Sequence, residues 1–185
     1  LAALGLSRPH MPYKGLIMAI LISPMIVPLI ITAAGMFFFY ARINLVYTFT
    51  GVILAHVALA TPFVVITVTA TLVGFDMNMV KAAQSLGAKP MRTFFKVIMP
   101  LILPGIISGA LFAFITSFDE VVIVMFMASI DQLTIPKQMW AGIRQEISPV
   151  ILCMATCLVL LSIFLLTTVE LLRRRSEKLR GIKAR

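Results

Sequence analysis

The chain has 185 residues, of which 61% are hydrophobic and only 12% are charged, and its formal net charge is +9. A soluble domain averages about 25% charged residues, so this composition excludes an ordinary soluble domain and indicates a membrane protein. Four apolar stretches are long enough to cross a bilayer, which takes roughly 20 helical residues. We expect an all-α membrane protein with one transmembrane domain over 1–185 and spans at about 15–40, 46–75, 101–128 and 149–172.

The positive charges are unevenly distributed between the connections of these spans. Only Arg42, Lys137 and Arg144 fall on one side, and the other 13 of the 16 Lys and Arg residues fall with the 76–100 segment and both termini. By the positive-inside rule, that side is cytoplasmic, with a basic tail at 173–185. We interpret the tail as a lipid-headgroup anchor rather than a nucleic-acid site. The 13 residues are Arg8, Lys14, Lys81, Lys89, Arg92, Lys96, Arg173, Arg174, Arg175, Lys178, Arg180, Lys183 and Arg185.

The sequence contains no catalytic constellation. It has no phosphate-binding glycine loop, no nucleophile with a base and no metal-ligand spacing, so we expect no enzyme activity from this chain and no metal. Cys153 and Cys157 lie four residues apart in the last span, and we interpret them as packing residues. We assign no chemistry to His10 or His56.

A polar segment separates the second and third spans. It reads Lys81-Ala82-Ala83-Gln84-Ser85-Leu86-Gly87 and is closed by Val97-Ile98-Met99-Pro100, which predicts a short helix, a glycine turn and a second short helix. The two alanines allow another protein to approach closely, and Gly87 can adopt the positive φ of a sharp turn. The pattern favours docking into a partner's groove; an ordinary amphipathic loop is the alternative.

The spacing of this segment resembles the E-A-A-x3-G-x9-I-x-L-P loop of binding-protein-dependent ABC importer permeases. Lys81, Val97 and Met99 stand where Glu, Ile and Leu are usual, and Lys81 reverses a charge. Pro104-Gly105-Ile106 and Ser117-Phe118-Asp119-Glu120-Val121-Val122 further resemble the spermidine/putrescine branch, in particular its second permease subunit.

The resemblance implies the type I ABC importer permease fold, which is methionine-importer-like and usually has six helices. The four spans would be the last four, with an amino-terminal part missing. It also implies a bacterial inner-membrane protein working with a second permease, a cytoplasmic ATPase dimer that binds ATP and magnesium, and a periplasmic binding protein. The ATPase-coupling loop would contain Ala82, Ala83, Gly87, Val97, Met99 and Pro100.

An acidic pair, Asp119-Glu120, lies some 18 residues into the third span, roughly 27 Å along a continuous helix. Acids in a membrane should face a bundle interior or a cavity. In such a helix, Phe112, Thr116 and the two acids share one face, which suits a desolvated ammonium. A structural ion pair, a helix-end position or a gate-shaping role are the alternatives.

The segment 129–148 is expected to be external, with a short amphipathic or re-entrant helix on the outer face. Trp140 is either an interfacial anchor or a contact for the binding protein. The leading hypothesis is a polyamine importer permease. The alternatives are an importer of another small solute, such as an amino acid or opine, and, from another class, a secondary transporter or scaffold subunit. An oxyanion would be repelled by the acidic pair.

Overall fold

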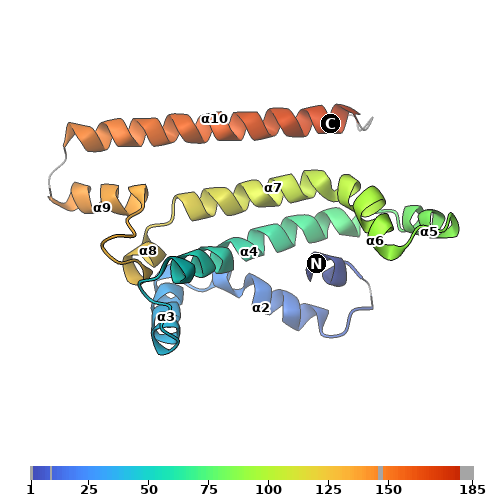
Figure 1. The fold of residues 1–185 in the computed structure, drawn as a ribbon, viewed down its shortest axis with the longest axis horizontal. Helices are drawn as coiled ribbons and strands as arrows, with labels where there is room; N and C mark the ends of the chain where they lie inside the picture. The colour runs from blue at the N-terminus through green and yellow to red at the C-terminus, as the bar shows by residue number, and fades with distance from the viewer. Residues whose placement is uncertain (1, 9, 146–147, 180–185) are drawn as a thin grey trace.

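The computed structural model describes residues 2–8, 10–145 and 148–179, and all regular structure within them is helical (Figure 1). The expected all-α membrane architecture is therefore confirmed. The helices in chain order are α1 Ala2–Leu6, α2 Lys14–Ile26, α3 Leu29–Arg42, α4 Phe49–Val73, α5 Asn78–Ser85, α6 Pro90–Thr93, the π-helix η1 Phe94–Ile98, α7 Met99–Phe118, α8 Val122–Met127, α9 Ile135–Gln145 and α10 Pro149–Leu179.

The centre of the molecule is the helix pair α4 and α7, which lie side by side along its long axis (Figure 1). Gly105 and Gly109 are buried on the face of α7 that meets α4. A Cβ at either position would collide with the side chain of Thr71 or Thr67. Small residues four apart on one helix let two membrane helices approach closely, which is how this pair gains its contact.

The first expected span, 15–40, is not one continuous helix. Helices α2 and α3 meet at an angle of 106°, and Val27 between them is extended, with φ −71° and ψ 136°. Pro28 explains the break, because a proline disfavours the helical conformation of the residue before it and has no N–H to continue the ladder. Pro24 and Pro62, by contrast, are accommodated inside α2 and α4.

The helices of the structure differ at both ends from the third expected span, 101–128. The helix starts earlier, because α6, η1 and α7 follow one another without interruption and give a candidate span Pro90–Phe118. It also ends earlier, because α7 stops at Phe118 and a separate short helix, α8, begins at Val122. The acidic pair therefore lies in the break between two helices.

Two apolar clusters hold the short helices against α4. At one end, Ala33, Ala55 and Ile123 are fully buried where α3, α4 and α8 meet. At the other end, Ala3 and Ile102 pack against Val68 and Leu72, which joins α1 and α7 to α4. Each short helix gains its stability from this burial, because helices of five or six residues are unstable alone in water.

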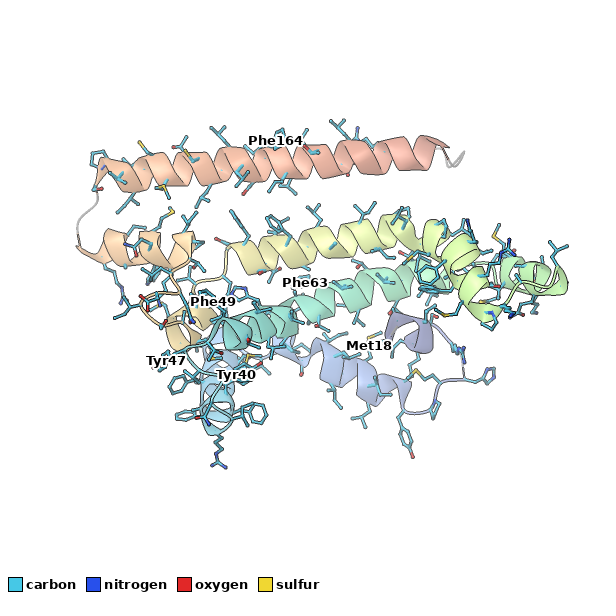
Figure 2. The ribbon with its side chains drawn as sticks, viewed as in Figure 1. Met18, Tyr40, Tyr47, Phe49, Phe63 and Phe164 are labelled. Atoms are coloured by element: carbon cyan, nitrogen blue, oxygen red, sulfur yellow. The ribbon has the colours of Figure 1, made fainter. Side chains whose placement is uncertain are left out.

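Helix α10 runs alongside α7 and contacts α7 and α9 (Figure 1). Its apolar window, Pro149–Thr168, has no residue buried within this chain, and Phe164 remains 65% exposed (Figure 2). With α4 and Pro90–Phe118, it makes three described helices that are long and apolar enough to span a membrane, and α2 with α3 could form a fourth, broken span. The expected tail 173–185 continues α10 as far as Leu179; positions 180–185, including Arg180, Lys183 and Arg185, lie outside the described residues.

Candidate coupling and transport sites

The two segments singled out in the sequence lie at opposite ends of the molecule. The α5–α6 hairpin is at one end, near α1 and the carboxyl end of α10, whereas α3, α8 and α9 gather at the other (Figure 1). Because α7 runs between them, it connects the hairpin directly to the acidic break.

The glycine turn of the hairpin is a Schellman motif. Gly87 has φ 80°, its N–H donates to the carbonyl of Gln84 at 2.9 Å, and the N–H of Ala88 donates to the carbonyl of Ala83 at 3.1 Å. This pattern provides donors for the last carbonyls of α5. It requires a residue with left-handed backbone conformation just after the helix, and glycine adopts that conformation without strain. The turn is thus fixed by local hydrogen bonds.

The hairpin presents small and apolar residues to its surroundings. Ala82 and Gly87 are exposed, Ala83 is half-buried, and the adjacent Leu86 is 89% exposed. Val80 of α5 and Thr93 of α6 are buried, and the two helices contact each other and η1.

The predicted second half of the loop motif is continuous with the membrane helix. Val97 lies in η1, and Met99 and Pro100 begin α7. The N–H of Met99 donates to the carbonyl of Phe94, five residues back, which is the π-type bond. Pro100 follows immediately and has no N–H to donate. A movement of the hairpin would therefore pass to α7 through a helical connection.

The two acids of the break have different environments. Glu120 is buried, at 6% exposed, and its Oε1 accepts the backbone N–H of Ile123 at 2.8 Å. It therefore satisfies a free N–H in the first turn of α8, where the helix dipole also favours an anion. Asp119 is exposed, and no hydrogen bond or ion pair of its carboxylate is found within the part of the chain that the structure describes.

Asp119 occupies an unfavourable place for a purely structural acid. It is the C-cap residue that directly follows α7, with φ −89° and ψ 3°. The carbonyl end of a helix carries partial negative charge, which disfavours an anion there by about 0.3–1 kcal/mol. The Asp119 carboxylate thus adds its charge to the partial negative charge at the carbonyl end of α7. An incoming cation would be attracted by the carboxylate and by the helix end.

The expectation that the four candidates share one helical face is wrong, because α7 ends before Asp119. Phe112 stacks on Phe63 of α4 with 6.4 Å between ring centroids (Phe63 is labelled in Figure 2), and the Thr116 hydroxyl donates to the Phe112 carbonyl within α7. Phe112, Thr116 and Glu120 do not line the cavity between α7, α9 and α10 that Asp119 lines.

Asp119 instead lines a cavity of about 540 Å³ between α7, α9 and α10. Its walls are almost entirely apolar and include the aromatic residues Phe114, Phe118 and Trp140. The Phe114 and Phe118 rings are stacked at 5.3 Å, and the Arg144 guanidinium lies 5.8 Å from the Trp140 ring centroid. A carboxylate and aromatic faces in an apolar cavity are suited to an organic cation.

Trp140 lies on α9, so the segment 129–148 does contain a short helix. It is 48% exposed and contributes to the cavity wall.

The sequence reasoning missed two polar residues near the break. The Nδ1 of His56 on α4 lies 2.9 Å from the Oγ of Ser117 on α7, and the imidazole also interacts electrostatically with Glu120. Lys137 on α9 donates through its Nζ to the carbonyls of Val124 and Ala128 at the end of α8. A polar residue in an apolar helix was the available signal for His56, but its partner is 61 positions away.

The fold and the two sites together define a helical membrane component in which α7 joins an exposed hairpin to an acidic break between two helices. The family of binding-protein-dependent transport system inner membrane components matches residues 1–178, and this chain belongs to that family. It is therefore a multi-pass inner-membrane transport component rather than an enzyme.

Three permease proteins of known name are similar to this chain. The spermidine/putrescine transport system permease protein PotC of Haemophilus influenzae is 30% identical over 177 residues, which cover 96% of this chain and 69% of that protein. Its Escherichia coli K12 counterpart is 29% identical over 178 residues, covering 96% and 67%. The putrescine transport system permease protein PotI of Escherichia coli K12 is 37% identical over 103 residues, covering 56% of this chain and 37% of PotI.

Proposed function

We propose that this chain is a permease subunit of an ATP-driven importer for polyamines such as putrescine and spermidine. The observation that carries the substrate class is Asp119, a carboxylate without a protein partner among the described residues, at the edge of an aromatic cavity. The names of the relatives agree with this class, because they are permease proteins of spermidine/putrescine and putrescine transport systems. A polyamine offers an ammonium for the carboxylate and methylene groups for the apolar wall.

The partners follow from the family. The chain would pair with a second, homologous permease, receive substrate from a periplasmic binding protein and dock on a cytoplasmic ATPase dimer, which binds ATP and magnesium. Its large unburied apolar surface, which includes all of the α10 window, agrees with insertion in lipid and with a second permease.

The α5–α6 hairpin is the proposed contact with the ATPase. Its exposed residues Ala82, Leu86 and Gly87 offer a small apolar surface on a turn that is fixed by hydrogen bonds. Closure of the ATPase would move the hairpin, and the helical connection through Val97, Met99 and Pro100 would carry that movement to the acidic break as a rigid body. The hairpin and the carboxyl end of α10 would then both be cytoplasmic, as the positive charges indicate.

The roles of the two acids differ in this account. Asp119 attracts the substrate cation, whereas Glu120 fixes α8 behind it. Phe112 and Thr116 would act on the path only indirectly, through the packing of α7.

Reconstitution of the complete assembly in lipid vesicles tests the proposal. Labelled putrescine and spermidine should accumulate when ATP and the binding protein are present, and a non-hydrolysable ATP analogue should abolish accumulation. Uptake of an amino acid in place of polyamines would refute the substrate class and leave the importer. Uptake driven by an ion gradient without ATP would instead support a secondary transporter.

A further inference from the structure

We propose that the carbonyl end of α8 is a binding site for a primary alkylammonium ion and that Lys137 occupies it as a displaceable internal ligand. The inference rests on the proposed function only for the identity of the displacing molecule.

The site is formed by two backbone carbonyls in a buried environment. The Nζ of Lys137 lies 3.4 Å from the carbonyl oxygen of Val124 and 3.3 Å from that of Ala128. Val124 is fully buried and Ala128 is 6% exposed, so these oxygens have little access to water. The Val124 carbonyl also accepts the N–H of Ala128, which closes the last turn of α8.

The chemistry of the site selects an ammonium with N–H groups. Both oxygens lie at the carboxyl end of α8, where the helix dipole is negative. The Val124 carbonyl uses one lone pair for the Ala128 N–H and has a second lone pair for an ammonium, and Ala128 follows the last residue of the helix. An ammonium brings three donors and a full positive charge, whereas a quaternary ammonium has no N–H for these oxygens. The site therefore favours a primary ammonium on a narrow alkyl stem, which is what a lysine side chain supplies.

Other polar contacts hold the site in place. Glu120 binds the opposite end of α8, and the N–H of Tyr47 donates to the Met127 carbonyl at 2.9 Å. The side chain of Gln132 donates to the Tyr47 carbonyl and accepts from the N–H of Ser129. The carbonyls of α8 thus stay oriented if the ammonium leaves.

Lys137 has the features of a displaceable occupant. Its ammonium is a strongly hydrated point charge on a flexible stem, and it lies in the first turn of α9, at the side of α8. A diaminoalkane carries the same head group on the same kind of chain. Asp119 lies three residues before α8, so a cation attracted to Asp119 arrives near a helix whose far end already holds an ammonium.

Chemical rescue tests the site itself. In the purified complete assembly, Lys137→Ala should lower the thermal unfolding temperature, and n-butylammonium should restore it in a concentration-dependent manner. Tetramethylammonium at equal ionic strength should not. The matched control is Arg144→Ala, which removes a cation from the same helix but none from the α8 carbonyls; n-butylammonium should produce no specific recovery there. Absence of recovery in Lys137→Ala, or equal effects of the two cations, overturns the site.

Transport kinetics test the displacement. Lys137→Met keeps the stem but removes the donors, so a substrate ammonium meets a weaker competitor, and KM for putrescine uptake should fall several-fold. Lys137→Arg, with its larger and persistent charge, should not lower KM. An unchanged or higher KM in Lys137→Met overturns the displacement. If the assembly carries no polyamine, the n-butylammonium measurement still decides the site, so the two proposals fail separately.

Discussion

Replacing Gly109 with alanine should separate α4 from α7, because the backbone of α4 lies close to this position. The added Cβ would overlap the hydroxyl oxygen of Thr67 and would stand 3.1 Å from the Cα of Val64. The Thr67 hydroxyl already donates to the Phe63 carbonyl at 2.7 Å, and the Val64 Cα belongs to the backbone of α4. Rotation of a side chain therefore cannot relieve both contacts.

The size of the effect follows from the required separation. Carbon atoms attract best at about 3.5–4.0 Å, so the helices must move apart by roughly 0.4–0.9 Å, and a gap of about 0.5–1 Å forfeits a quarter to a half of each contact. Overpacking of this kind costs about 1–3 kcal/mol. Alanine recovers about 1 kcal/mol of helix propensity over glycine, which leaves a net destabilisation of about 1 kcal/mol.

The matched control is Gly35→Ala on α3, where nothing lies within 4 Å of the new Cβ. That variant should be unchanged or slightly more stable. The free energies of unfolding of both variants can be compared by denaturant titration in mixed micelles. If Gly109→Ala is as stable as Gly35→Ala, the close α4–α7 contact is not present in the protein.

Three further predictions concern single side chains. Glu120→Ala should destabilise the protein by about 0.5–2 kcal/mol, as loss of a helix-terminal acceptor does, and hydrogen exchange should rise at the Ile123 amide; unchanged exchange would contradict the capping role. Thr69→Val should stabilise by about 1 kcal/mol in thermal unfolding, because the Thr69 hydroxyl is buried without a partner among the described residues; a loss of stability would reveal a hidden partner. Gly87→Val should leave insertion intact but lower the transport obtained per ATP hydrolysed, because φ is 80° there; a normal ratio would contradict the role of the turn.

Much of the fold could be predicted from hydropathy and from the position of a glycine in a turn. The span over α4 follows from a run of 25 mostly apolar residues without a charged side chain, and Gly87 marks the turn after α5 correctly. The break at 119–121 could not be seen in the same way, because Val121–Ala128 continues the apolar run. An acid just before an apolar stretch is also a helix-start signal, so Glu120 could have indicated the beginning of α8.

The contacts between residues that are far apart in the chain could not be predicted from the sequence. The partner of His56 is Ser117, and the ammonium of Lys137 reaches a carbonyl 13 positions away. Both depend on how α4, α7, α8 and α9 pack, which no local pattern encodes. The same packing makes Glu120 a buried helix cap and leaves the Asp119 carboxylate without a partner among the described residues.

The most direct measurement of the central claim is ATP-dependent putrescine uptake by the complete assembly, with native protein compared with Asp119→Asn. This variant keeps the size of the side chain and removes the charge from the cavity. The account predicts that uptake collapses while the amount of assembled complex and its unfolding temperature stay unchanged. If Asp119→Asn takes up putrescine at the same rate as the native protein, or if the amount of assembled complex falls together with uptake, a role of this carboxylate in attracting the substrate is contradicted.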